Sequence, residues 1–191
     1  MDVAVNTDDR RISEEAVAFA KANRKEIAKR LTDPLVYLSE DSPVSVFMAG
    51  SPGAGKTEAS LEFLTRFGGS VLRIDTVSLN IRRSLKRGRF VLVLYVYQNP
   101  ERAWEFVQAR EKVEGRNIPM HGFVDQYFAA REVVNRLKYE FGHAVTVDIF
   151  IKNHDGSTKA YRQNIQQIDT HIPEIYDRAS LERRLNSRRY E

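Results

Sequence analysis

The eight residues from Gly50 to Thr57 read GSPGAGKT, and their types and spacing suit them to hold phosphate. Gly53 and Gly55 let the backbone curl so that its N–H groups point inward at phosphate oxygens. Lys56 adds a charge that reaches the outer phosphates, and the Thr57 hydroxyl can ligate a Mg²⁺ ion that bridges the two terminal phosphates. We therefore expect a site for a nucleoside triphosphate, ATP or GTP, with Mg²⁺. The predicted binding residues are Gly50, Ser51, Pro52, Gly53, Ala54, Gly55, Lys56 and Thr57.

The residues on both sides of this loop support that interpretation. The preceding run, VSVFMA, is apolar and rich in β-branched residues, which predicts a strand. The following residues, from about Lys56 to Phe67, predict a helix that the pair Gly68 and Gly69 closes. A phosphate-binding loop of this type lies between a strand and a helix, and the helix directs its positive end at the phosphates.

Two arginines follow at a distance along the chain. Arg110 occupies the next position of the apolar stripe of a helix predicted over residues 100–115, where a helix packed on a sheet would prefer Leu or Val. Its stem could cover apolar surface while its head reaches solvent, or its guanidinium could be directed at a transferring phosphate. Arg116, just past Gly115 and followed by Pro119, is a second candidate. Together they predict the base of a mobile lid that stabilises transition-state charge and excludes water.

Asp75 is the third candidate catalytic residue. It ends a strand predicted over residues 70–75, and open α/β sheets place their ligands at the carboxyl ends of their strands. Its carboxylate could orient an acceptor hydroxyl and take its proton, or hold Mg²⁺ through water. Alternatively, it could end the strand and cap the next turn. The four histidines are scattered without metal-ligand spacing and receive no role.

The order of elements predicts an α/β fold. Residues 89–97 are almost wholly apolar, which is typical of a strand in the middle of a parallel sheet. Residues 145–153 alternate between apolar and polar, which indicates an edge or near-edge strand. Further helices are predicted over residues 13–31, from residue 78 to 88, and up to a stop at Gly142. We expect a single domain over residues 1–191 with a three-layer P-loop NTPase or kinase fold, a mainly parallel sheet flanked by helices.

Composition and charge narrow the class of protein further. The chain has 191 residues, 42% of them apolar, and no cysteine, which excludes disulfides and thiolate-bound metal. Basic residues cluster between Arg82 and Arg89 and again at the C-terminus; they could bind nucleic acid, nucleotides or phosphorylated sugars, or be solvated helix faces and a frayed tail. No apolar stretch reaches the roughly 18 residues that span a bilayer. We expect a cytoplasmic protein without a membrane segment.

The chain resembles the zeta toxin family of P-loop kinases over most of Ile12 to about His171. The resemblance rests on AFAKANRKEIAKRLTDP, VFMAGSPGAGKTEAS, VLRID, VLVLYVYQNPERAWEFVQAREKVEGRNIP, FVDQYFAAREVVNRLKYEFG and VDIFIKNHDGS. It implies a toxin of a toxin–antitoxin system that transfers the terminal phosphate of ATP or GTP to a hydroxyl. In the best-known members the acceptor is UDP-N-acetylglucosamine, so that cell-wall precursor synthesis is blocked, and an antitoxin restrains the enzyme.

Carried over by residue, the resemblance assigns nucleotide and Mg²⁺ to Lys56 and Thr57 and phosphate stabilisation to Arg110 and Arg116. Asp75 matches the first acidic position after the family's second strand.

One departure from the family pattern affects the acceptor site. The second acidic position holds Val77, and a sizeable segment, which in the family holds much of the acceptor pocket, is missing after about residue 76. Three hypotheses follow: a kinase for a nucleotide sugar such as UDP-N-acetylglucosamine, a kinase for another acceptor such as a polynucleotide end, and a nucleotide-binding module without catalysis. The basic clusters motivate the second, and Val77 with the missing segment motivates the third.

Overall fold

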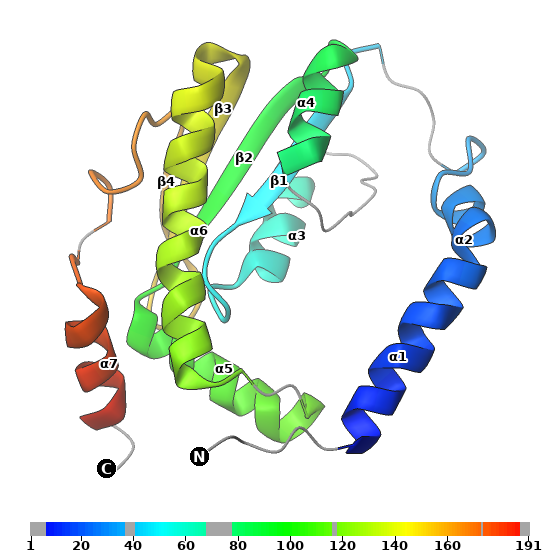
Figure 1. Ribbon diagram of the computed structural model, residues 1–191. Helices are drawn as coiled ribbons and strands as arrows, with labels where there is room; N and C mark the ends of the chain where they lie inside the picture. The colour runs from blue at the N-terminus through cyan, green and yellow to red at the C-terminus, as the bar shows by residue number, and fades with distance from the viewer. Residues whose placement is uncertain (1–6, 37–40, 68–77, 116–117, 173, 188–191) are drawn as a thin grey trace. The chain divides into compact units, whose positions relative to one another are not determined.

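The computed structural model describes residues 7–36, 41–67, 78–115, 118–172 and 174–187. Their elements are α1 (Thr7–Ala22), α2 (Arg24–Leu31), β1 (Val44–Ala49), α3 (Lys56–Phe67), α4 (Ser78–Lys86), β2 (Phe90–Tyr97), α5 (Pro100–Glu114), α6 (Met120–Phe141), a 3₁₀ turn (Gly142–Ala144), β3 (Val145–Lys152), β4 (Thr158–Arg162) and α7 (Arg178–Ser187), labelled in Figure 1. Helices α1 and α2 belong to one compact unit, and the elements from β1 to α7 belong to another.

The described residues of the first unit form two helices where the sequence predicts one. The predicted helix from Ser13 to Leu31 in fact begins earlier, at Thr7, and is interrupted at Asn23. The Asn23 side-chain amide donates a hydrogen bond of 2.9 Å to the carbonyl oxygen of Phe19, and its backbone N–H donates to the same oxygen at 3.0 Å. Asparagine favours such local bonds over a regular helix, and this explains the break.

Within the described residues, the second unit is built on a four-stranded sheet in the order β1-β2-β3-β4. The first three strands are parallel, and β4 is antiparallel to β3. In the register, Val93 at the middle of β2 lies between Phe47 of β1 and Val147 of β3. All residues of β2 after Phe90 are buried. The prediction of a central parallel strand at this position is therefore confirmed.

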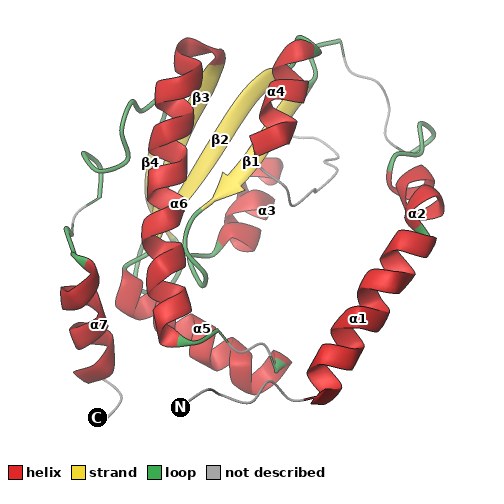
Figure 2. Ribbon diagram, in the orientation of Figure 1, coloured by secondary structure: helices red, strands yellow, loops and turns green. Residues whose placement is uncertain are grey.

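Helices cover both faces of the sheet, as Figure 2 shows for α3 on one side and α4 and α6 on the other. Alternate residues of β2 contribute to the two apolar clusters, because successive side chains of a strand point to opposite faces. The larger cluster packs the sheet against α4, α5, α6 and α7, and includes Ile81, Val93, Tyr95, Val107, Phe123, Leu137, Ile149, Leu181 and Leu185. The smaller packs it against α3 and includes Ala54, Ala59, Leu92, Leu94, Val96 and Phe150. The three-layer α/β prediction is confirmed.

The sequence predicts an edge or near-edge position for β3. The structure confirms the near-edge position, and β4 forms the edge itself. The polar side chains of β3 are not all exposed to solvent, however. Asp148 is buried and accepts hydrogen bonds from the Tyr161 hydroxyl and from the Asn164 backbone N–H, the latter at 2.8 Å. The sequence pattern did not predict β4, which supplies Tyr161.

The described residues of the C-terminal basic cluster are helical, so the interpretation as a frayed tail is wrong for them. Residues Arg178–Ser187 form α7, in which Leu181 and Leu185 are buried. The first basic cluster, from Arg82 to Arg89, does lie on an exposed face, and Arg82 forms an ion pair with Glu140 of α6. The strand predicted over residues 70–75 and the predicted missing segment after residue 76 lie outside the described residues.

Candidate nucleotide-binding site

The GSPGAGKT loop connects the carboxyl end of β1 to the start of α3, as predicted. A Cβ atom on Gly50, where φ is +142°, would lie 2.4 Å from the carbonyl oxygen of Val96 at the end of β2. A Cβ on Gly53, where φ is +70°, would lie 2.1 Å from the carbonyl oxygen of Ala103 in α5. Neither position has room for a side chain. The loop is therefore packed between the end of β2 and the first turns of α5.

The Lys56 side chain folds back over this loop. Its Nζ atom donates hydrogen bonds to the carbonyl oxygens of Gly50, at 3.0 Å, and Ser51, at 2.8 Å. Lys56 is also the first residue of α3, where the backbone N–H groups of the first turn carry the positive end of the helix dipole. The ammonium group and the helix terminus thus place two sources of positive charge at the same loop, which suits a bound phosphate chain.

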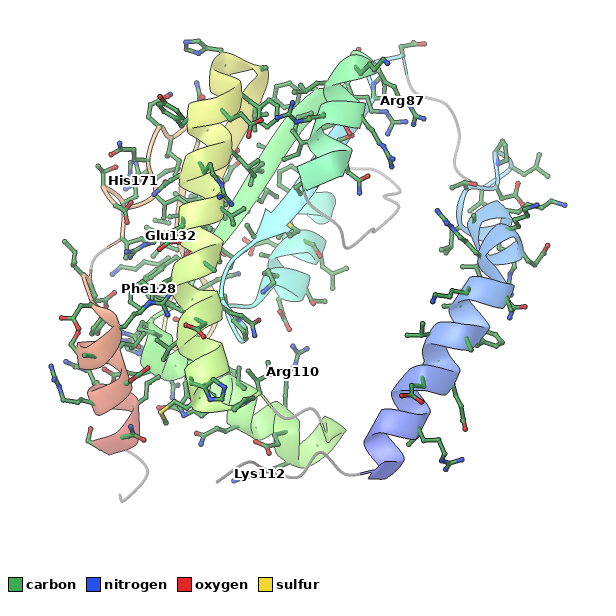
Figure 3. The ribbon with its side chains drawn as sticks, viewed as in Figure 1. Arg87, Arg110, Lys112, Phe128, Glu132 and His171 are labelled. Atoms are coloured by element: carbon green, nitrogen blue, oxygen red, sulfur yellow. The ribbon has the colours of Figure 1, made fainter. Side chains whose placement is uncertain are left out.

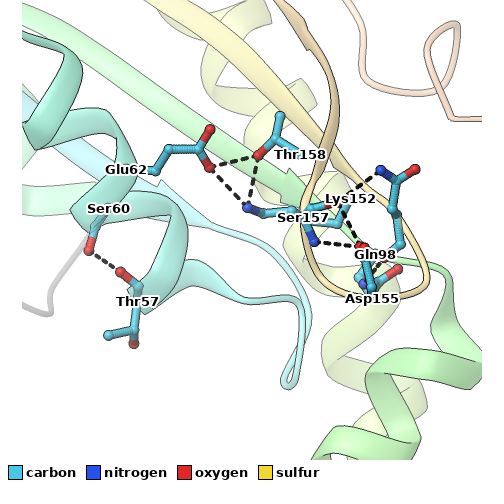
Figure 4. Close-up of polar contacts among 9 residues, drawn as sticks. Thr57, Ser60, Glu62, Gln98, Lys152, Asp155, Ser157 and Thr158 are labelled. Carbon is cyan, nitrogen blue, oxygen red and sulfur yellow. Dashed lines mark hydrogen bonds and ion pairs between the residues drawn. The ribbon is translucent and has the colours of Figure 1, made fainter.

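Thr57 lies in the first turn of α3 and is partly buried. Its backbone carbonyl accepts a hydrogen bond of 2.7 Å from the Ser60 hydroxyl (Figure 4). Within the described residues, no group of three or more His, Cys, Asp or Glu side chains is placed to hold a metal ion.

Arg110 projects from α5 and is exposed (Figure 3). It follows Ala103 by seven residues, so it lies on the same face of the helix about 10 Å further along the axis. Ala103 is the residue against which the loop packs, so the face of α5 that begins at the loop leads to Arg110. The two other predicted catalytic residues, Asp75 and Arg116, lie outside the described residues.

The start of α5 is fixed by two polar residues that the sequence analysis did not select. The Asn99 side-chain oxygen accepts from the backbone N–H groups of Glu101, at 3.0 Å, and Arg102, at 3.3 Å, and so caps the helix. Gln98 is buried; its side chain accepts from the Asn99 N–H and donates to the carbonyl of Asn153, each at 2.8 Å. The Asn-Pro-Glu sequence was the signal for this cap. These bonds hold the Ala103 carbonyl in place against the loop.

A partly buried polar cluster lies at the carboxyl end of β2. The Tyr97 hydroxyl donates to the Glu174 carboxylate, and the Asn99 side-chain amide donates to the other Glu174 oxygen at 3.3 Å. Burial, with Glu174 adding to it, raises the pKa of Tyr97 above its ordinary value, and burial raises the pKa of Tyr127 to about 12. Both hydroxyls remain protonated at neutral pH, so the cluster ties the segment before α7 to the sheet without a tyrosinate.

The sheet, the loop and the flanking helices define the class of protein, a nucleotide-binding α/β protein of the P-loop kinase type. The family model described as zeta toxin matches residues 27–81 and 74–166, which is more than half of the chain. The chain therefore belongs to the zeta toxin family.

The solved structures include a chain of similar fold, and the curated proteins include no match. That structure is described as a molecular and structural characterization of the PezAT chromosomal toxin–antitoxin system of the human pathogen Streptococcus pneumoniae. It shares 14% sequence identity with this chain, covers 94% of this chain and 98% of its own, and has a TM-score of 0.53. Of the helices within the described ranges, none is both long and apolar enough to cross a membrane.

Proposed function

We propose that the protein is a kinase that transfers the terminal phosphate of ATP or GTP, with Mg²⁺, to a hydroxyl of a nucleotide sugar such as UDP-N-acetylglucosamine. Membership of the zeta toxin family over residues 27–166 supports the reaction class. The observation that carries the proposal is the loop itself, in which Gly50 and Gly53 leave no room for side chains and Lys56 folds over the loop carbonyls.

In the proposed reaction, the acceptor hydroxyl oxygen forms a bond to the terminal phosphorus while the bond from that phosphorus to the bridging oxygen breaks. The nucleoside diphosphate leaves, and the hydroxyl proton passes to the Asp75 carboxylate. Lys56 holds the outer phosphates, and Arg110 and Arg116 stabilise the charge on the transferring group. Thr57 would hold Mg²⁺, which when bound neutralises the charge of the phosphates.

We also propose that an antitoxin protein binds this chain and that the chain acts in the cytoplasm. The similarity to a chain from a toxin–antitoxin system supports the first part. That similarity is one of fold, so an antitoxin is to be sought as a co-purifying protein that lowers the kinase rate.

The test is an assay of the purified protein with Mg²⁺ and either ATP or GTP, with and without UDP-N-acetylglucosamine. We expect formation of nucleoside diphosphate that depends on the sugar nucleotide, and a product heavier by one phosphate group in mass spectrometry. Lys56→Ala abolishes the product, because the outer phosphates lose their cation. Lys159→Ala is the control, because Lys159 is an exposed lysine of β4. No product from any sugar nucleotide would overturn the proposal.

A second candidate function is nucleotide binding without catalysis. The family model matches in two stretches that overlap at residues 74–81, next to the place where the sequence predicts a missing acceptor segment. This observation favours a protein whose loop still binds a nucleotide and whose acceptor site has been lost. Saturable binding of Mg²⁺-ATP or Mg²⁺-GTP, removed by Lys56→Ala and accompanied by no sugar product, would support this candidate over the first.

A further inference from the structure

A buried lysine lies beside the nucleotide-binding loop and is not part of it. Lys152 ends β3, and its side chain is only 3% exposed. Its Nζ atom donates a hydrogen bond of 2.9 Å to the Thr158 hydroxyl and lies 3.3 Å from the Glu62 carboxylate, to which that hydroxyl in turn donates at 2.7 Å (Figure 4). These three residues form a closed polar cluster, called the Lys152 cluster below.

The Lys152 cluster lies beside the loop on one side. A Cβ atom on Gly55 would lie 4.0 Å from Cε of Lys152, so the lysine stem occupies the space next to that turn. Glu62 belongs to α3, and it follows Lys56 by six residues, about 9 Å along the helix. The helix that presents Lys56 and Thr57 is therefore held to the sheet through Glu62, within two turns of its start.

Strands β3 and β4 form an antiparallel hairpin that carries Lys152. This hairpin also reaches the other side of the loop. Just after Lys152, the carbonyl of Asn153 accepts from the Gln98 side chain at 2.8 Å. The carbonyl of His154 accepts twice from the Arg102 guanidinium, at 3.1 and 3.0 Å. Arg102 precedes Ala103, the residue whose carbonyl packs on the loop. The hairpin thus joins α3 and the start of α5, and the loop lies between these two helices.

The hairpin turn is well suited to hold this position. Its Asp155 carboxylate accepts from the Ser157 backbone N–H at 2.9 Å and from the Ser157 hydroxyl at 2.7 Å. These bonds lower the pKa of Asp155, and the bond from the Ser157 hydroxyl has the larger effect. The carboxylate therefore stays ionised in the neutral range. The Asn153 backbone N–H closes the turn on the Ser157 carbonyl at 2.8 Å.

A buried ion pair is a poor way to gain stability, since an apolar group of the same shape often serves as well or better. Such a pair favours one geometry, because its buried donors and acceptors must be satisfied. At the Lys152 cluster the lysine is buried and Glu62 is 30% exposed, and the favoured geometry is that of the helix and turn that would contact the phosphates of the proposed nucleotide.

We propose that Lys152 is a positioning residue for the nucleotide-binding loop and that it acts through Glu62 and Thr158. Lys152 does not contact the nucleotide; it sets where the Gly55 turn and the first turn of α3 lie. The effect on nucleotide affinity rests on the proposed nucleotide binding, whereas the effect on the order of the loop does not.

The test uses Lys152→Met, which keeps the stem and removes the ammonium group, and Lys159→Met as the matched control on the same hairpin. Two quantities are measured on the full chain: the amide hydrogen exchange of a peptide spanning residues 50–57 without nucleotide, and the Kd for Mg²⁺-ATP. We expect faster exchange in the loop and a Kd about tenfold weaker for Lys152→Met, the scale typical of groups that orient a binding residue. Lys159→Met leaves both within twofold, and Lys152→Arg recovers part of the loss.

The two readouts separate failure of the inference from failure of the proposed function. If the unaltered protein binds neither ATP nor GTP, the proposed function fails and loop exchange alone decides the inference. Unchanged loop exchange in Lys152→Met overturns the inference. Equally faster exchange in α6 also overturns it, because the change would then be a general loss of stability. If Lys152→Met does not fold, Glu62→Gln, at a side chain 30% exposed, takes its place with the same expected and contrary results.

Discussion

Replacing Gly53 by alanine would place a methyl carbon 2.1 Å from the carbonyl oxygen of Ala103, a separation that real side chains do not adopt. The oxygen that the methyl carbon would meet belongs to the backbone of α5. The Asn99 cap and the buried Gln98 hold that backbone in place. The clash cannot be relieved by turning a side chain. Either the loop moves away from α5 or α5 moves away from the loop.

The magnitude follows from comparison with Gly88→Ala. Gly88 has a φ of +68°, nearly the +70° of Gly53, but a Cβ there would meet nothing within 4 Å. Alanine in this region of backbone space costs about 1–2 kcal/mol, offset by about 0.4–1 kcal/mol from the stiffer unfolded chain. Gly88→Ala should therefore destabilise by about 1 kcal/mol. Gly53→Ala adds a packing clash of about 1–3 kcal/mol.

The assay measures two quantities for both variants, the free energy of unfolding in urea and the Kd for Mg²⁺-ATP. If the loop stays in place, the free energy of unfolding of Gly53→Ala is lower than that of Gly88→Ala by the energy of the packing clash. If the loop moves instead, the cost appears as an affinity about 5- to 150-fold weaker, the equivalent of the same energy. If Gly53→Ala and Gly88→Ala have the same free energy of unfolding and the same Kd, the contact between the loop and α5 is refuted.

Three further predictions concern other parts of the second unit. Leu185→Ala in α7 should lower the free energy of unfolding by about 2–5 kcal/mol in urea, because Leu185 is 2% exposed; a change below 0.5 kcal/mol, roughly that of a surface site, would contradict its place in the core. Burial raises the pKa of Tyr127, so its contribution to stability is complete below the ordinary pKa near 10 and is lost as pH rises toward about 12. Tyr127→Phe should then lose stability less steeply over that range, by up to about 1.4 kcal/mol per pH unit in urea titrations, and equal slopes would argue against the shift. Arg110→Met should lower kcat about 10³-fold while Lys112→Met on the same helix does not, and similar rates would remove Arg110 from the proposed mechanism.

The parts of the fold that the sequence predicts are those with a strong local pattern. Residues Phe90–Tyr97 are apolar without interruption, and a strand of that kind has few places other than the centre of a parallel sheet. The loop from Gly50 to Thr57 carries a fixed spacing, and its strand and helix neighbours are where the pattern requires them. Gly142 ends α6 as predicted, with a φ of +53° that favours glycine.

The parts that the sequence does not predict depend on partners far along the chain. Strand β4 is five residues long and mixed in polarity, so it is defined by its pairing with β3 and has no strong pattern of its own. Lys152 reads as a polar residue on an exposed face until Glu62, 90 positions earlier, is found beside it. The helix α7 contains only two buried apolar residues among many charges, which gives a weak periodicity.

The contacts of α7 impose an order on how the second unit is completed. Leu181 and Leu185 fill the apolar cluster beside α6, and Arg184 forms an ion pair with Glu101, a buried carboxylate in the first turn of α5. During synthesis from the N-terminus, a chain extended only to residue 177 contains the whole phosphate-binding loop, yet Glu101 lacks that cation and α6 lacks that cover. The helix that bears Arg110 therefore reaches its final support only when α7 has emerged, long after the loop has been made.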